Sequence, residues 1–244
     1  MRVEQQSGFI LHSRAWRETS LLLECLTREH GRVGLVARGV RRERARIPRA
    51  LLQPLVALNL GWSGRGELAT LNGIEADGQM PAMAGQALLC ALYVNELVLR
   101  LTLRHDPQPQ LYDAYAQTLA RLAGDEPSAW TLRRFERDLL TQLGYAPAFD
   151  QDGSDGSQLN PAADYGYRDD FGFVPWSAGA GPKIGGATLL AFAADRMPEA
   201  KALPALRRLM RYLIAKQLDG KELQAWSMMG SVRQIAGVSK ISSG

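Results

Sequence analysis

The residues best suited to chemistry in this sequence are arginines gathered in one short segment, residues 38–49. Six of its twelve residues are arginine and only one, Glu43, is a carboxylate. The arginines are Arg38, Arg41, Arg42, Arg44, Arg46 and Arg49. An unpaired guanidinium loses a large hydration free energy on burial, so this basic segment must lie in water or against an anion. The chemistry that it predicts is the binding of phosphate or another polyanion.

The net charge of the chain is concentrated in the same region. Residues 1–79 contain twelve arginines, no lysine and eight carboxylates, whereas the remaining residues carry equal numbers of cations and carboxylates. A positive excess confined to one third of a chain favours nucleic acid or another polyanion as its partner. A solvated loop that binds nothing is the alternative interpretation.

Short apolar runs with glycine or polar breaks surround the basic segment and predict strands. The candidate strand segments are residues 8–11, 20–26, 33–37, 51–52 with 55–60, and 68–71. Five strands in so short a span favour a small OB-type barrel, which holds single strands by a positive groove and by stacking bases on aromatic side chains. The available aromatics are Phe9, Trp16 and Trp62. Trp16 lies among charged residues that include Arg14, and core packing is its alternative role.

After Pro81 the sequence changes to alanine- and leucine-rich helical patterns. Predicted helices cover residues 87–101, 111–122, 128–143, 187–194 and 204–218. Residues 146–186 are rich in Gly, Asp and Pro and predict loops with one β-hairpin, formed by residues 165–168 and 171–175. The predicted fold class is α+β. A five-stranded OB-type β-barrel in residues 1–80 precedes a mainly α-helical domain in residues 81–244, with a loop and hairpin insertion at about 146–186.

Patterns typical of catalysis or metal binding do not occur in the sequence. The three histidines are scattered, and the glycine-rich residues 179–186 lack the Gly-Lys-Ser/Thr of a phosphate loop. Cys25 and Cys90 lie far apart in apolar runs, which predicts buried free thiols in a reducing compartment. The first residues form no apolar signal segment. We therefore expect a cytoplasmic protein that is not an enzyme and needs no cofactor.

Two blocks of the sequence resemble one bacterial protein family. The first block consists of Gly8–Arg14, Glu18–Leu21, Thr27–Val33, Leu35–Arg41 and Leu52–Pro54, and the second of Leu132–Leu140 with Leu143-Gly144-Tyr145. They resemble, respectively, the N-terminal domain and the helical domain of the RecO family of DNA repair proteins. The resemblance covers nearly the whole chain in matching order.

The resemblance implies a recombination mediator of the RecF pathway. Members of this family bind single- and double-stranded DNA through the OB fold and anneal complementary strands. With RecR they help to load RecA onto DNA coated by single-strand-binding protein (SSB), whose C-terminal tail they recognise. We therefore expect DNA, RecR and the SSB tail as partners, RecA indirectly, no membrane, and a cytoplasmic location at the nucleoid. The expected DNA-binding residues are Arg14, Trp16 and the six arginines of the basic segment.

An acidic tail that ends in an apolar residue and a free carboxylate requires a hydrophobic groove with a guanidinium at its rim. The predicted helix that begins near Ser128, its expected N-cap, and ends at Gly144 offers such groups. The candidate tail-binding residues are Arg133, Arg134, Leu139, Leu143 and Tyr145. In the alternative interpretation, the leucines belong to the core and the arginines form a solvated face.

Some members of the family carry a four-cysteine zinc module soon after the Leu-Gly-Tyr motif. Here the corresponding place reads Asp152-Gly153-Ser154-Asp155, and no cysteine follows Cys90. Since structural zinc sites use thiolates and imidazoles, we expect no metal and a module retained only as loop and hairpin. The alternative function is an adaptor that docks on SSB or RecR and binds DNA weakly. A nuclease is a more remote alternative, because no acidic metal-binding cluster is present.

Overall fold

The computed structural model describes residues 2–42, 45–64, 66–78, 83–178, 181–221 and 223–226. Two compact units are formed, one by Met1–Asp125 with Leu223–Gly244 and the other by Glu126–Glu222. The strands lead the chain and helices dominate after residue 83, so the predicted α+β class is confirmed. The last barrel strand ends at Ala76 and the first α-helix begins at Gly85. The predicted domain boundary between residues 80 and 81 lies outside the described residues and stays a prediction.

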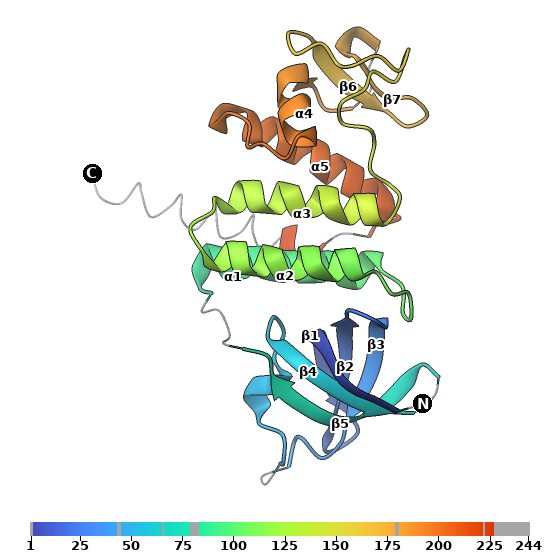
Figure 1. Ribbon diagram of the computed structural model, residues 1–244, viewed down its shortest axis with the longest axis vertical. Coiled ribbons are helices and arrows are strands. Elements are labelled where there is room, and N and C mark those ends of the chain that lie inside the picture. The colour runs from blue at the N-terminus through green and yellow to red at the C-terminus, as the bar shows by residue number, and fades with distance from the viewer. Residues whose placement is uncertain are drawn as a thin grey trace, which may run out of the picture. The chain divides into compact units, whose positions relative to one another are not determined.

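A closed five-stranded barrel forms the first part of the first unit (Figure 1). Its strands are β1 (Arg2–Trp16), β2 (Ser20–Thr27), β3 (Gly31–Ala37), β4 (Ala57–Ser63) and β5 (Leu68–Ala76). They follow the order β1-β2-β3-β5-β4, and β4 pairs with β1 to close the ring. All pairs are antiparallel except β3 with β5, which is parallel. This arrangement is the predicted OB-type barrel.

Alternate apolar side chains of the strands fill the barrel, as the period of two requires. Ile10, Leu23, Leu35, Leu58 and Leu60 are all completely buried in its core. The first strand is much longer than the predicted residues 8–11, since two irregularities in its pairing bend it so that it lies against both β2 and β4.

One predicted strand start is wrong. Leu51 and Leu52 belong to a short 3₁₀ helix, η1 (Arg49–Leu52), and β4 begins only at Ala57. Pro54 has no backbone N–H to give to a strand ladder, and the following Leu55 has a positive φ of 70°. The 3₁₀ helix instead buries Leu52 in the barrel core.

Two helices pack on the barrel within the same unit, α1 (Gly85–Leu101) and α2 (Pro109–Ala123). The buried Asn95 of α1 donates a hydrogen bond to the carbonyl oxygen of Leu11 in β1, and it accepts one of 2.9 Å from the Tyr115 hydroxyl of α2. The Phe9 ring lies 5.5 Å from the Tyr112 ring and 5.0 Å from the Tyr115 ring. Phe9 is therefore a core residue.

The described part of the second unit contains three α-helices, two short 3₁₀ helices and a small sheet (Figure 1). Its elements are α3 (Ser128–Gln142), β6 (Asp164–Arg168), β7 (Gly172–Pro175), η2 (Trp176–Ala178), β8 (Ile184–Gly185), α4 (Gly186–Ala193), η3 (Ala200–Ala202) and α5 (Leu203–Gln217). The sheet has the order β7-β6-β8, and β6 with β7 is the predicted hairpin. Within the described ranges, no three His, Cys, Asp or Glu side chains are grouped as metal ligands.

The C-terminal end of α3 is explained by its hydrogen bonds, and its N-terminal end differs from the prediction by one residue. Ser128 is the first helical residue, and the N-cap is Pro127, without a side-chain capping bond. At the other end Gly144 has a φ of 77°, its N–H donates to the Thr141 carbonyl at 3.1 Å, and the N–H of Tyr145 donates to the Leu140 carbonyl at 2.8 Å. These two bonds define a Schellman motif, so Gly144 is the expected C′ residue.

Candidate nucleic-acid interface

The basic segment leaves the barrel at the end of β3 and is anchored there by one apolar side chain. Val40 is buried in the barrel core, and the N–H of Arg41 donates to the carbonyl oxygen of Thr19 at 3.0 Å. Gly39, which directly precedes Val40, has a φ of 68° and supplies the left-handed turn at this point. The arginines on either side of this anchor point outward and are exposed. They are Arg38, Arg41, Arg42, Arg46 and Arg49, whereas Arg44 lies outside the described residues.

These guanidinium groups are not neutralised by carboxylates of the part of the chain that the structure describes. Their one side-chain hydrogen bond there runs from Arg41 to the carbonyl oxygen of Arg17, at 3.3 Å. Other arginines of the same unit are paired. Arg28 donates to Asp113 at 2.9 Å, and Arg104 bridges Glu24 and Glu67, the latter at 3.0 Å. The exposed arginines of the basic segment are therefore available to an external anion.

A groove of about 800 Å³ joins the start of the basic segment to the turn between β1 and β2. Its lining includes the cations Arg17, Arg38 and Arg42, one carboxylate, Glu18, the Trp16 ring and the apolar Val36 and Leu68. The Trp16 ring is partly exposed, and the guanidinium carbon of Arg14 lies 5.9 Å from its centre. This Trp16 groove thus combines cations with an aromatic face, the two features that bind single-stranded nucleic acid.

The three candidate aromatic side chains differ in exposure and in whether they line the groove. Phe9 and Trp62 are both 5% exposed, which leaves no face on which a base could stack outside the barrel. Trp16 is the one of the three that lines the groove. Arg17, which sequence reasoning did not single out, also lines it. Its position directly after Trp16, in the turn between two strands, was the available signal, since such turns present their side chains to solvent.

The candidate tail-binding residues do not share one surface. Arg133 is 5% exposed and pairs with the buried Glu136, one turn further along α3, at 2.6 Å between Nε and Oε2. Leu139 is completely buried in the core. A peptide on the surface cannot reach either side chain. Leu143 is half-buried and Tyr145 is 53% exposed, so these two remain accessible next to the Schellman turn.

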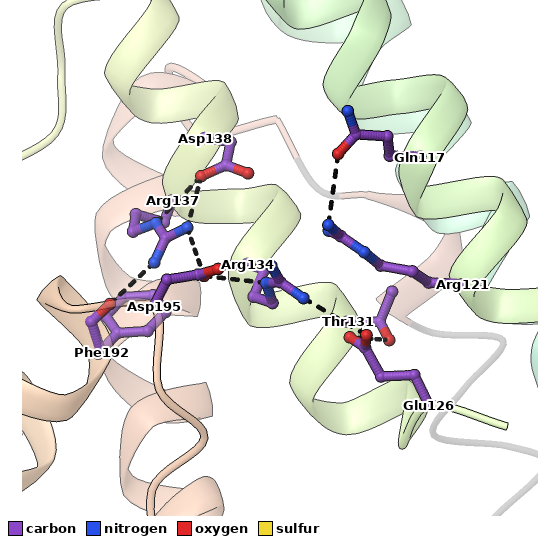
Figure 2. Close-up of polar contacts among 9 residues, drawn as sticks. All are labelled: Gln117, Arg121, Glu126, Thr131, Arg134, Arg137, Asp138, Phe192 and Asp195. Atoms are coloured by element: carbon purple, nitrogen blue, oxygen red, sulfur yellow. Dashed lines mark hydrogen bonds and ion pairs between the residues drawn. The ribbon is translucent and has the colours of Figure 1, made fainter.

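Arg134 is only partly exposed, with 16% of its side-chain surface accessible, and it already holds a carboxylate. Its Nε donates to Asp195 at 2.9 Å, and Arg137 donates to the same carboxylate at 2.8 Å (Figure 2). Arg134 also contacts Glu126 at 3.4 Å, and Arg137 donates to the carbonyl oxygen of Phe192 at 2.8 Å. We call Arg134, Arg137 and Asp195 the carboxylate clamp.

The pKa values of Asp195 and Arg134 in the clamp are both shifted. Partial burial opposes ionisation of Asp195, but the hydrogen bonds from Arg134 and Arg137 outweigh it and lower the pKa of its carboxyl. Burial likewise opposes the charge of Arg134, and the bond to Asp195 more than compensates, raising the pKa of that guanidinium. Within this chain the clamp is thus an occupied carboxylate-binding site.

Together the closed OB-type barrel and its aromatic, cation-lined groove define the class of protein, an OB-fold protein with a surface suited to polyanions. Residues 1–79 match the family model Recombination protein O N terminal, and residues 84–225 match Recombination protein O C terminal. The chain belongs to the RecO family of DNA repair proteins.

Curated relatives agree over almost the full length. The DNA repair protein RecO of Xanthomonas euvesicatoria pv. vesicatoria (strain 85-10) is 46% identical over 235 residues, which cover 94% of this chain and 97% of the relative. The protein of the same name from Stenotrophomonas maltophilia (strain K279a) is 46% identical over 233 residues, with the same coverage. A role in DNA repair and recombination follows from this membership. In the part of the chain that is described, no helix has the length and apolar character needed to cross a membrane.

Proposed function

We propose that this protein is a recombination mediator that binds single- and double-stranded DNA through the Trp16 groove and the basic segment, and that it catalyses no bond chemistry. The observation that carries the proposal is the set of exposed arginines without carboxylate partners among the described residues, arranged beside a partly exposed tryptophan. Contacts of this kind bind the phosphates of DNA whatever its base sequence. A mediator that acts at any gap in DNA requires such binding.

Annealing of complementary strands is the second part of the proposal. Two strands repel each other through their phosphates, and a surface that carries several guanidinium groups lowers this repulsion. The barrel region carries the whole positive excess of the sequence, so the two strands would meet there. A partly exposed Trp16 can hold one unpaired base while its phosphate lies against Arg38 or Arg42.

The third part concerns protein partners. We infer that the protein acts with RecR to promote RecA loading onto SSB-coated single strands, in the cytoplasm at the nucleoid. The accessible candidates for the acidic SSB tail are Arg134, Leu143 and Tyr145, which combine a guanidinium with apolar surface. The tail carboxylates would have to displace Asp195 from the carboxylate clamp, since Arg134 already binds it.

The proposal is tested by strand annealing with a groove variant and a charge-matched control. Arg38→Ala/Arg42→Ala removes two exposed cations of the groove, and Arg208→Ala/Lys221→Ala removes two exposed cations elsewhere. We expect the first variant to anneal fluorescently labelled complementary strands at least about tenfold more slowly at a limiting protein concentration, because two charged contacts to phosphate are lost. The control should anneal at the wild-type rate.

Equal annealing and equal DNA affinity of the two variants would contradict DNA binding at the groove. That outcome would favour the adaptor, whose main activity is docking on SSB or RecR. Metal-dependent cleavage of DNA by the purified protein would contradict the non-enzymatic part of the proposal.

A further inference from the structure

The Trp16 groove has one carboxylate among its cations, and the proposed function does not account for it. Glu18 lies in the turn between β1 and β2, directly after Trp16 and Arg17. It lines the groove together with Arg17, Arg38 and Arg42. Three guanidinium groups and one carboxylate therefore border the same space, which has a volume of about 800 Å³.

The Glu18 carboxylate has no cation within ion-pair distance in the described ranges of the chain. Other carboxylates of the barrel unit differ in this respect. Glu24 and Glu67 both contact Arg104, the latter at 3.0 Å. Glu18 is also exposed. Its negative charge thus acts on whatever enters the groove, because no partner in the described part of the chain offsets it.

The backbone that carries Glu18 is tied to the basic segment on both sides. The N–H of Arg41 donates to the carbonyl oxygen of Thr19 at 3.0 Å, and Nη1 of Arg41 donates to the carbonyl oxygen of Arg17 at 3.3 Å. Thr19 and Arg17 are the two chain neighbours of Glu18. These two bonds hold the turn beside the basic segment, so Glu18 and the exposed arginines border one groove.

A carboxylate beside a phosphate-binding site weakens that site. Like charges a few ångströms apart in water repel each other enough to lower an affinity by about fivefold, and salt screens the effect. Natural binding sites use repulsive groups of this kind as well as attractive ones. Glu18 therefore lowers the phosphate affinity that Arg17, Arg38 and Arg42 would give without it.

Limited phosphate affinity suits strand annealing, because a strand that has paired with its complement must leave the protein. Differences in affinity among variants of one binding site lie mainly in the dissociation rate. We propose that Glu18 is a specificity-determining residue of the Trp16 groove, which repels DNA phosphates and thereby speeds the release of a bound strand. This inference rests on the proposed DNA binding and adds to it the control of release.

The test compares Glu18→Gln with a charge-matched control. The amide keeps the size of the Glu18 side chain and removes its charge. Glu75→Gln removes one exposed carboxylate of β5 that does not line the groove. Fluorescence anisotropy gives dissociation constants for labelled thymidine and deoxycytidine oligonucleotides of equal length at several salt concentrations. Stopped-flow mixing with excess unlabelled strand gives the dissociation rate constants, and thermal melting followed by circular dichroism verifies that each variant is folded.

We expect Glu18→Gln to bind both oligonucleotides about threefold to fivefold more tightly at low salt and to release them more slowly by a similar factor. The gain should shrink as salt is added, since screening weakens the repulsion that the substitution removes. At a limiting protein concentration, Glu18→Gln should anneal complementary strands more slowly than the wild type, because each protein molecule is freed more slowly. Glu75→Gln should keep the wild-type affinity and release rate.

Three results would overturn the inference. Affinity and release equal to those of Glu75→Gln would show that Glu18 does not act on phosphates. Tighter binding without slower release would contradict the control of release. Weaker binding of the deoxycytidine strand alone would show that the carboxylate accepts a hydrogen bond from a base amino group, which thymine lacks.

The arginine variant separates this inference from the proposed function. If Glu18→Gln fails in one of these ways and Arg38→Ala/Arg42→Ala still weakens the binding of both strands, the proposed function stays intact. Unchanged binding by the arginine variant would instead contradict the proposed function itself.

Discussion

The arginines of the barrel unit fall into two groups according to what lies beside them. Arg28, Arg32 and Arg104 have carboxylates within ion-pair distance, and they join strands to the helices or to neighbouring turns. Arg38 and Arg42 line a groove and have no such partner among the described residues. Residue type alone cannot separate these groups, because the distinction depends on which carboxylates the fold brings near. The local density of arginine in residues 38–49 was the sequence signal that pointed to the correct group.

At the same scale, one substitution tests the aromatic part of the groove. Trp16→Ala removes the ring on which a base can stack, so we expect a loss of about 1–3 kcal/mol in the free energy of single-strand binding. Trp16→Phe keeps a ring and should lose less. Anisotropy titrations of both variants measure the difference. Equal, wild-type affinities for the two variants would show that Trp16 supports the fold only.

A second residue-scale prediction concerns the carboxylate clamp. If Arg134 binds the carboxylates of an SSB tail peptide, the Asp195 carboxylate competes with them for the same donors. We therefore expect Asp195→Asn to bind the peptide more tightly, by a factor of about three to ten, since one charge-assisted contact no longer has to be broken. Calorimetric titration with the peptide measures this. Weaker or unchanged binding would remove Arg134 from the proposed tail site.

At the scale of helices and strands, the repeating patterns of the sequence predicted where most elements lie. They did not fully predict which side chains of α3 and β4 face the core. In α3, Leu132, Phe135, Leu139 and Leu143 recur at helical spacing, and the first three are buried in the core whereas Leu143 is half-buried. Arg133 also faces inward because Glu136, three residues later, neutralises it. That spacing was visible in the sequence, but only the packing shows that the pair is buried.

Strand β4 also shows how the position of a side chain in an element decides whether it is buried. Trp62 follows Leu58 and Leu60 at intervals of two residues, and all three side chains are buried in the barrel core. The alternation therefore predicts an inward tryptophan, whereas its aromatic character alone had made it a candidate for base stacking. Where two signals conflict, the periodicity of the element is the better guide to orientation.

A glycine substitution tests the junction between the barrel and α2. Gly31 has a φ of 64°, and a Cβ atom there would lie 2.2 Å from the carbonyl oxygen of Asp106. We expect Gly31→Ala to lower the free energy of unfolding by at least about 2 kcal/mol, since strain and a backbone clash add together. Gly66→Ala is the control, because its φ is 86° but no atom lies within 4 Å. Urea unfolding should show a loss of only about 1 kcal/mol for the control. Equal losses would contradict the close approach at Gly31.

The acidity of Asp195 predicts how the turn after α4 responds to pH. The pKa of its carboxyl is lowered in the folded chain, so the clamp stabilises the fold above about pH 4, the ordinary range of Asp, and loses this effect as the pH falls through the lowered value. The Asp195 side chain is 42% exposed, which limits the effect to about 1 kcal/mol or less. Melting temperatures of wild type and Asp195→Asn should differ at pH 7, and the difference should shrink as the pH falls below the ordinary range of Asp. A difference that is constant with pH would contradict the assignment.

At the scale of the whole molecule, charge and fold are distributed unequally. The barrel region carries the positive excess, whereas the sequence after residue 79 is balanced in charge. The match to the two RecO family models divides the chain in nearly the same place. The remainder has no net charge of its own, so it does not offset the positive excess of the barrel region. Composition could predict this asymmetry, but not the Trp16 groove, since the groove arises from segments that only the closed barrel brings together.

The central claim is that exposed guanidinium groups of the barrel hold the phosphates of DNA. Its most direct test is the slope of the logarithm of single-strand affinity against the logarithm of salt concentration. Each phosphate contact contributes about 0.7 to that slope. We predict that Arg38→Ala/Arg42→Ala makes the slope shallower by about 1.4, and that Arg208→Ala/Lys221→Ala leaves it at the wild-type value. An identical slope for all three proteins would contradict the account.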